Sequence, residues 1–441
     1  MKNNKFTLQC VKCGQEFDGF SEWFDVNQVC PQCNSKHVEA VYDDDLTGMK
    51  NLLQSSDEQV KSFWHYFDYL PLISRDNIIS FGEGAIPVER WKFLEAYARD
   101  AYGLHNEVWV YRNDKNGGTG TFKDIGASLA ASILKEHGIK DYVVASTGNT
   151  ATAFSRYMSK AGISTYIFMP VDALKASESE INVYGQKVFR VQGDYAKAKE
   201  IAASFAKKHG FLMTGGNVDP LRVESKKTMV FEWLRQMGKL PDVYVQALSG
   251  GTGPIAIDKA LRDLKGTEYD NPMPRQVLVQ PDKCPPMALA WERAVQNNFP
   301  EGWDTNFPVI ENPQTRVPTL ATGKPGTYPL ISHLVKDSNG SIIQMKEEKI
   351  NDIARWMAYE TSIAMGPASA VCMGGFLNAL KQGLIKDGES VLVNTGEGVT
   401  RAPEFMEEMI YVTDDVYSVD DCKLHDRKGL REVLRRKAVE R

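Results

Sequence analysis

The sequence predicts an α/β protein whose parallel sheets are covered by helices and preceded by a small cysteine-rich unit. From about residue 107 to residue 400, short apolar runs alternate with longer segments of helical spacing, which is typical of parallel sheets. Residues 1–42 contain two close pairs of cysteines. The length of 441 residues exceeds one ordinary domain, and the hydrophobic fraction of 42% is that of a globular protein.

The predicted elements follow one another along this central region. We expect strands at Val108–Tyr111, Tyr142–Ala145, Thr165–Met169, Lys187–Val191, Val243–Leu248, Gln276–Gln280 and Ser390–Asn394. Helical spacing predicts helices such as Asp124–His137, Ala151–Ala161 and Tyr195–His209. Residues 281–345 are richer in proline and asparagine, which indicates an irregular segment.

Composition and charge exclude several classes of protein. The formal net charge is −5 without a long run of one sign, which argues against nucleic acid as the main partner. No apolar run approaches the ~18 residues of a membrane span, and the N-terminus has no apolar signal core. We therefore expect a cytoplasmic protein with no membrane partner. The basic segment Arg427–Arg441 is predicted to be a solvated terminal helix.

Cys10, Cys13, Cys30 and Cys33 form two CxxC pairs separated by sixteen residues. This spacing is typical of a zinc ribbon, in which two tight turns complete a tetrahedron of thiolates. The alternative is four free buried cysteines. A four-thiolate site leaves no position open for water, so the predicted zinc would be structural. Residues 1–42 are thus the predicted ribbon, 43–106 a connecting arm, 107–412 the core and 413–441 a charged tail.

The segment Gly117–Gly126 places Lys123 between a glycine-rich loop and a helix. The positive end of the peptide dipoles at a helix start lowers the pKa of a nearby amine and favours formation of an imine. The alternatives are that Lys123 binds a phosphate or that it is solvated on the surface.

Three further loops follow predicted strands. The turn Ser146–Thr150 opens a helix, and its amides can bind an anion such as a substrate carboxylate, although an ordinary capped turn has the same pattern. The loop Ser249–Gly253 has three glycines and two hydroxyls and suits a phosphate, but it is neither a Walker loop nor a dinucleotide fingerprint. The loop Asn394–Gly398 ends the last predicted strand.

These loops, in this order, resemble those of the fold-type-II pyridoxal-phosphate (PLP) enzymes, the tryptophan synthase β-subunit superfamily. Threonine synthases are the most similar, and some of them also carry a zinc ribbon. The motifs that carry the resemblance are TGTFKD at 119–124, STGNT at 146–150, SGGTG at 249–253, GPASA at 366–370, NTGEG at 394–398, and the stretch Asn217–Thr228, which is similar to NPxRxEGQKT. Together they cover most of residues 60–402.

The resemblance implies two parallel-sheet α/β lobes with PLP between them, so that residues 107–412 form the PLP-binding catalytic core. It implies that Lys123 is the catalytic residue and carries PLP as a Schiff base, that Asn149 bonds the 3′-oxygen and that Thr395 bonds the pyridine nitrogen. A neutral hydroxyl at that nitrogen favours elimination and replacement over transamination. The remaining implied contacts are the cofactor phosphate, with Ser249, Gly250, Gly251, Thr252 and Gly253, and the substrate carboxylate, with Ser146, Thr147 and Thr150. A homodimer is the expected assembly.

The sequence also departs from the threonine synthase pattern. Ile125 replaces the arginine of FKDRG, Ala85 and Ile86 replace two polar residues of GEGNTP, and Gly216 replaces an asparagine that contacts phosphate in the family. We interpret these changes as altering which phosphorylated amino acid fits. Leu240–Ala247 with the SGGTG loop, and an arm ending in Tyr69-Leu70-Pro71, resemble cysteate synthase instead.

The expected reaction is PLP-dependent elimination or replacement on a phosphorylated amino acid, in which the freed Lys123 amine removes the α-proton. Conversion of phosphohomoserine and water to threonine is favoured. The alternatives are replacement of the phosphate of phosphoserine by sulfite, and dehydration of a hydroxyamino acid. A non-enzymatic protein that binds nucleic acid through its ribbon is the remaining hypothesis. For the leaving phosphate we expect a second anion pocket, with Arg222 favoured over Lys227 and Arg112.

Overall fold

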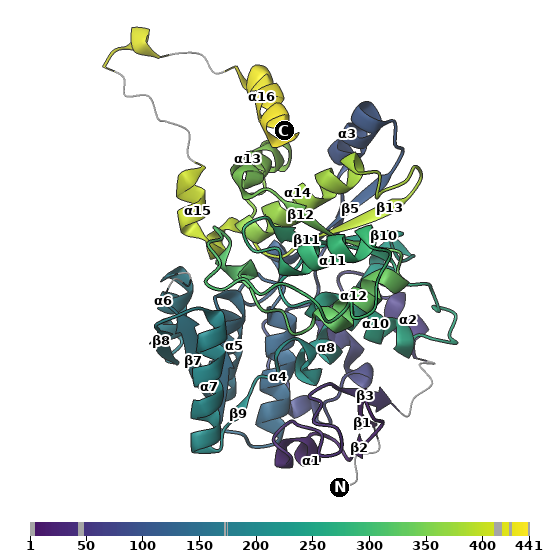
Figure 1. The fold of residues 1–441 in the computed structure, drawn as a ribbon, viewed down its shortest axis with the longest axis vertical. Helices are drawn as coiled ribbons and strands as arrows, with labels where there is room; N and C mark the ends of the chain where they lie inside the picture. The colour runs from purple at the N-terminus through teal and green to yellow at the C-terminus, as the bar shows by residue number, and fades with distance from the viewer. Residues whose placement is uncertain are drawn as a thin grey trace.

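A computed structural model describes residues 5–42, 48–171, 173, 175–409, 417–422 and 426–439. It contains a six-stranded sheet, a four-stranded sheet and a small three-stranded sheet near the N-terminus. In Figure 1 the four-stranded sheet lies at the lower left, the six-stranded sheet above it, and the N-terminal sheet at the lower end. The α/β class with parallel sheets is therefore confirmed.

The six-stranded sheet is parallel except for its edge strand β4, which pairs antiparallel with β5. Its inner strands are apolar runs because helices cover both faces, and Val245 at its centre pairs with Val277 on one side and Val393 on the other. In sheet order the strands are β12 Ser341–Met345, β11 Arg275–Pro281, β10 Val243–Ala247, β13 Ser390–Thr395, β5 Glu107–Arg112 and β4 Val88–Arg90.

The four-stranded sheet is parallel throughout. In sheet order its strands are β8 Lys187–Val191, β7 Ser164–Pro170, β6 Asp141–Ala145 and β9 Leu212–Met213. All seven strands expected from the sequence are present in the two sheets, and β4, β9 and β12 are additional. The short strands β4 and β9 are too brief to show a pattern of their own.

Helices cover the sheets and fill the space between them (Figure 1). Helix α14 packs on β10 to β13, α7 packs on β6 and β7, and α4 packs on both α5 and α8. The helices of the core are α3 Lys92–Tyr102, α4 Asp124–Glu136, α5 Asn149–Ala161, α6 Lys175–Val183, α7 Tyr195–His209, α8 Pro220–Lys226, α9 Thr228–Met237, α10 Thr252–Asp263, α11 Pro286–Gln296, α12 Tyr328–Asp337, α13 Ile350–Thr361, α14 Pro367–Lys381 and α15 Pro403–Glu408. A short helix, α2 Met49–Leu53, lies in the preceding arm.

The expectation that residues 281–345 are irregular is wrong for part of the segment. It contains helices α11 and α12 and, at its end, strand β12. Two of the prolines that suggested an irregular segment, Pro286 and Pro329, stand in the first turns of α11 and α12, where the missing amide hydrogen costs no helical hydrogen bond. Between these helices the chain is largely irregular, as expected.

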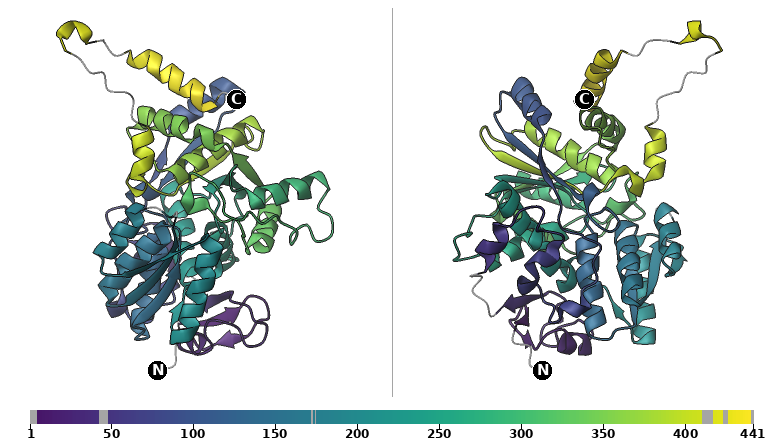
Figure 2. Two further views of the ribbon diagram at one scale, coloured as in Figure 1. Left: turned by 60° about the vertical axis from the view of Figure 1, so that its left-hand side comes forward. Right: turned by 180° about the vertical axis from the view of Figure 1, so that it is seen from behind.

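The N-terminal ribbon consists of β1 Phe6–Cys10, β2 Glu16–Phe17, β3 Val38–Tyr42 and the short helix α1 Phe20–Asp25. It attaches to the core through Glu224 of α8, which accepts hydrogen bonds from the Ala40 amide at 2.8 Å and the Tyr42 hydroxyl at 3.0 Å. Both views in Figure 2 place the ribbon at the end of the molecule opposite to the C-terminal helix.

The C-terminal helix α16, Arg427–Val439, forms where the sequence predicts one and packs on α13. Leu434 and Ala438 are buried, whereas most of its basic side chains face solvent. The last two residues of the predicted helix, and the expected boundary at 412–413, lie outside the described residues. Among the residues that the structure describes, no helix combines the length and apolar composition needed to cross a bilayer.

Candidate active site

A cavity of about 1030 Å³ opens where strands β6, β10 and β13 end. Ala145, Ala247 and Asn394, at the carboxyl ends of these strands, line it, so both large sheets contribute. This is the edge at which parallel α/β sheets generally bind ligands. Ten of the predicted site residues line the cavity: Lys123, Ser146, Thr147, Asn149, Thr150, Arg222, Ser249, Gly250, Gly251 and Thr252.

The loop before Lys123 is held in a fixed shape by Asp124. The buried Asp124 carboxylate accepts hydrogen bonds from the amides of Thr119 at 2.7 Å and Thr121 at 2.8 Å. Gly118 has a φ of +86°, and a Cβ there would lie 2.3 Å from the Tyr157 hydroxyl, so only glycine fits. The Phe122 amide donates to the Gly396 carbonyl at 3.0 Å, which joins this loop to the loop after β13.

Lys123 stands at the N-terminal boundary of α4 with its side chain at the cavity. Burial and the positive charge of Arg222, opposed by Glu397, together lower the pKa of Lys123 to about 8. About a tenth of this amine is therefore neutral at pH 7, far more than of an ordinary lysine, and the neutral form is the one that attacks a carbonyl or accepts a proton.

The turn before α5 has the geometry of an anion-binding helix start. The Ser146 hydroxyl accepts hydrogen bonds from the Gly148 and Ala151 amides, both at 3.2 Å. The free amides of the first turn of α5 lie at the cavity beside Ser146, Thr147 and Thr150. This arrangement suits the substrate carboxylate that the sequence places here.

Asn149 is bound to two charged residues. Its amide group donates to the Glu397 carboxylate, and its amide oxygen accepts from Arg401 at 3.3 Å. Burial raises the pKa of Glu397, although the hydrogen bond from Asn149 and the charge of Lys123 oppose this rise. Glu397 lines the cavity, although the motif NTGEG suggested a role only for Thr395. An Asn amide nitrogen has two hydrogens, so Asn149 retains one for a further acceptor.

The loop Ser249–Gly253 forms a tight cradle at the start of α10. A Cβ on Gly250 would lie 1.8 Å from the Asn217 side-chain nitrogen, and one on Gly253 would lie 2.1 Å from the Gln246 side-chain oxygen. The Thr252 hydroxyl donates to the Asn217 side chain at 3.0 Å. Gly253 itself does not line the cavity, whereas Asn217 and Gln246 do. The sequence analysis assigned a role to neither side chain, although Asn217 begins the stretch that resembles NPxRxEGQKT. The free amides at this helix start suit a phosphate.

Thr395 is buried and does not line the cavity. Its hydroxyl donates to the Tyr111 carbonyl at 2.8 Å. To donate to a cofactor nitrogen the hydroxyl would have to turn away from Tyr111, so this role stays a prediction.

Arg222 is a nearly buried guanidinium that faces the cavity from α8. It donates to the Gly216 carbonyl at 2.8 Å, and no carboxylate of the described residues lies within ion-pair distance. Burial lowers the pKa of Arg222, and the nearby Asp219 opposes this. A buried cation without an ion-pair partner is costly, so this position suits an anionic ligand.

The other two candidates for an anion pocket are placed elsewhere. Arg112 forms ion pairs with Glu89 and Asp114, both at 2.6 Å. Lys227 forms ion pairs with Glu224 and Asp263, both at 2.8 Å. Neither lines the cavity, so both serve the fold.

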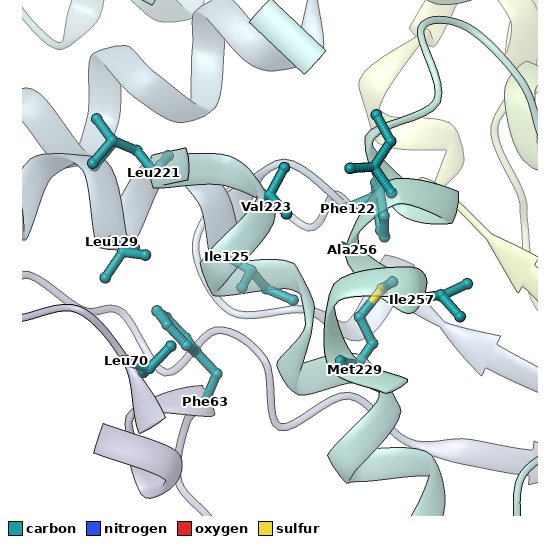
Figure 3. Close-up of a cluster of buried hydrophobic side chains, with 14 of the residues drawn as sticks. Phe63, Leu70, Phe122, Ile125, Leu129, Leu221, Val223, Met229, Ala256 and Ile257 are labelled. Carbon is teal, nitrogen blue, oxygen red and sulfur yellow. The ribbon is translucent and has the colours of Figure 1, made fainter. Parts of the chain in front are cut away.

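Of the four positions that depart from the threonine synthase pattern, only Gly216 lines the cavity. Ile86 and Ile125 are completely buried in the apolar core. Figure 3 shows Ile125 among Leu129, Val223 and other apolar side chains between α4 and α8. Ala85, Ile86 and Ile125 therefore do not line the cavity, and an influence of these three positions on which phosphorylated amino acid fits stays a prediction.

The four ribbon cysteines converge on one point. Their sulfur atoms all lie within 4.8 Å of one another, with Cys10 and Cys33 at 3.5 Å and Cys13 and Cys30 at 3.6 Å. Four thiolates at about 2.3 Å from a tetrahedral zinc ion are separated by roughly 3.8 Å. The donor set and its spacing fit zinc.

Comparison with known families gives one match that covers most of the chain. The family model described as "Pyridoxal-phosphate dependent enzyme" matches residues 79–396. That range contains all the residues that line the cavity except Glu397, from the Lys123 loop to Gly396 after β13.

Individual relatives are similar over nearly their whole length. A threonine synthase from Methanocaldococcus jannaschii is 25% identical over 89% of this chain and 92% of its own. A cysteate synthase from Methanococcoides burtonii is 26% identical over 95% of each chain. Among solved structures, diaminopropionate ammonia lyase from Escherichia coli has a TM-score of 0.60 at 16% identity, over 81% of this chain and 92% of its own. The last similarity concerns the fold alone.

Proposed function

Because this chain belongs to the pyridoxal-phosphate dependent enzymes, we propose that it eliminates or replaces the phosphate of a phosphorylated amino acid. The observation that carries the proposal is Arg222, a buried guanidinium at the cavity without an ion-pair partner among the described residues. The names of the relatives, threonine synthase and cysteate synthase, agree with a substrate of this class.

The residues at the cavity fit the cofactor. The cradle at Ser249–Gly253 would take its phosphate, the remaining hydrogen of the Asn149 amide its 3′-oxygen, and the Lys123 amine its aldehyde carbon. Bound PLP withdraws electrons from an attached amino acid and so eases loss of the α-proton and of a leaving group.

The protein supplies binding and proton transfer. Ser146, Thr147 and the first amides of α5 would bind the substrate carboxylate and orient the Cα–H bond. The neutral Lys123 amine would then accept the α-proton, which a lysine of ordinary pKa does poorly near neutral pH. Arg222 would hold the leaving phosphate through charge-assisted hydrogen bonds.

Phosphohomoserine, giving threonine with water, is the substrate that we favour. The ribbon, the FKD and NTGEG motifs and the stretch from Pro220 to Thr228 agree with threonine synthases. Gly216 offers no side chain to the anion, and nothing lies within 4 Å of a Cβ built there. Because of this open position, the contacts to the anion differ from those of the threonine synthase pattern. This difference is the observation that favours phosphoserine with sulfite as the second candidate.

Phosphate release tests the reaction. The holoenzyme is incubated separately with phosphohomoserine, phosphoserine, serine and threonine, and inorganic phosphate, oxo acids and product amino acids are measured. We expect phosphate and threonine from phosphohomoserine. Release from phosphoserine alone, accelerated by sulfite, would support the second candidate. Deamination of serine or threonine with no phosphate release from either phosphoamino acid would contradict the proposal and indicate a dehydratase.

The ribbon cysteines are proposed to hold one structural zinc ion. We expect one zinc per chain in protein purified under reducing conditions without chelator, and Cys10→Ser should reduce this content well below one because one thiolate of the tetrahedron is lost. Cys422→Ser is the matched control, since Cys422 is exposed and lies outside the cluster. Absence of metal from the wild-type protein would contradict the assignment.

A further inference from the structure

A second buried basic side chain, Lys226, lies one helical turn from Arg222. Lys226 follows Arg222 by four residues on α8, so their side chains emerge on the same face of the helix. Lys226 is 1% exposed. Among the described residues its amine has no carboxylate within ion-pair distance, although the next residue, Lys227, has two.

The surroundings of Lys226 connect it to the cavity. Its Nζ lies 4.9 Å from the centre of the Phe122 ring, and Lys123 Nζ lies 5.1 Å from the same centre. A Cβ on Gly126 of α4 would lie 3.3 Å from Lys226 Nζ and 3.5 Å from Arg222 Cγ, so both side chains pass over this glycine. Lys226 does not itself line the cavity, but Phe122, Lys123 and Arg222 do.

The charged groups around Lys226 do not neutralise it. Arg222 and Lys123 are cations, and the nearby carboxylates, Asp219 and Asp124, are engaged by the backbone amides that each one caps. The other charged groups packed against α8 are paired among themselves: Lys259 and Asp263 of α10 with Lys227 and Glu224, and Glu39 of β3 with Arg262.

We propose that Lys226 is a proton-binding member of the anion pocket, uncharged when the pocket holds no anion and protonated when a tetrahedral dianion binds beside Arg222. This inference rests on the proposed function and goes beyond it, because it links binding of the phosphate group to uptake of a proton from solvent.

Physical chemistry supports this coupling. Burial lowers the pKa of Lys226 well below its usual value, and the charges of Arg222 and Lys123 lower it further. A dianion at Arg222 reverses the local field, and charges interact strongly where water is excluded. The pKa of Lys226 must then rise, and one amine goes from neutral to charged as the anion binds. The two negative charges of the dianion would thus face two positive charges: the permanent charge of Arg222 and the charge that Lys226 gains with its proton.

Sulfate is the probe of choice, because it has the shape and charge of a phosphate dianion and does not titrate near neutral pH. The holoenzyme is used, so that the cofactor occupies its own phosphate cradle. Isothermal titration with sulfate in buffers of different ionisation enthalpy gives the number of protons bound per sulfate. We expect net proton uptake by the wild-type enzyme near neutral pH.

Lys226→Met should abolish this uptake and weaken sulfate binding on the order of tenfold, the contribution of one charge-assisted interaction. Methionine is close to lysine in length and has no charge to bury, so the variant should fold. Lys197→Met is the control: Lys197 also lines the cavity, but Glu200 holds it at 2.9 Å, and its loss should leave the proton count unchanged.

Uptake that persists in Lys226→Met, or that is lost in Lys197→Met, would overturn the inference. Such a result would leave the proposed function intact as long as phosphoamino acids still release phosphate. Conversely, an enzyme that releases no phosphate from either phosphoamino acid refutes the proposed function whatever the sulfate titration shows.

Discussion

Lys123→Ala is expected to abolish the visible absorption of the imine between protein and cofactor and to lower turnover by roughly 10³-fold or more. The reason is that Lys123 is the amine at the mouth of the cofactor cavity whose neutral form is populated near neutral pH. The loop around it should keep its shape, because Asp124 and Gly118 determine that shape. Absorption spectra and single-turnover rates measure the two effects.

Lys226→Met is the matched control for this experiment, since Lys226 lies against the same Phe122 ring. It should retain the imine absorption. If Lys123→Ala kept the band while Lys226→Met lost it, the two lysines would have been assigned in the wrong order.

Arg222→Met is expected to raise KM for the phosphorylated substrate by about 100-fold, which corresponds to roughly 3 kcal/mol for a bidentate charge-assisted contact. Affinity for PLP should change little, because the cradle at Ser249–Gly253 does not include Arg222. The free energy of unfolding should rise by about 1 kcal/mol, since the variant removes a buried charge that lacks a counter-ion. Steady-state kinetics and urea unfolding measure these quantities.

The opposite signs of the two effects distinguish a binding role from a structural one. If Arg222 had a structural role instead, its replacement would lower the free energy of unfolding and leave KM unchanged. Arg190→Met is the control, because Arg190 is exposed on β8 and pairs with Glu178, and both KM and stability should stay near the wild-type values.

The strands and the loops could be predicted from the sequence for a physical reason. Strands buried on both faces are continuous apolar runs, and glycines of the loops that follow them, such as Gly118 and Gly250, occupy positions where a Cβ would collide with neighbouring atoms. Such constraints act locally and leave a local pattern. The family resemblance that these loops suggested is confirmed by the family match over residues 79–396.

What the sequence could not show depends on contacts between distant segments. Ile125 replaces the arginine of the motif and was interpreted as altering which phosphorylated amino acid fits, but its side chain packs in the core between α4 and α8 (Figure 3). Glu397 accepts a hydrogen bond from Asn149, although the two residues are 248 positions apart in the chain. Lys226 and Lys227 are adjacent and chemically identical. Only the fold shows that Lys227 has ion-pair partners, whereas Lys226 has none among the described residues.

The Arg222 pocket and the cradle meet at Asn217. Its side-chain oxygen accepts a hydrogen bond from the Thr252 hydroxyl, and the residue lies in the turn that leads into α8. Its side chain thereby connects the segment proposed to bind the substrate anion with the segment proposed to bind the cofactor anion. No single motif contains both segments, so the connecting role of Asn217 could not be predicted from the sequence.

The most direct test of the account is to reduce the PLP-loaded wild-type enzyme with borohydride, digest it and locate the modified lysine by mass spectrometry. Reduction fixes the cofactor to whichever amine carries it. The account predicts that the peptide containing Lys123 carries the cofactor mass and that peptides containing Lys226 or Lys227 do not. Attachment to any lysine other than Lys123 would contradict it.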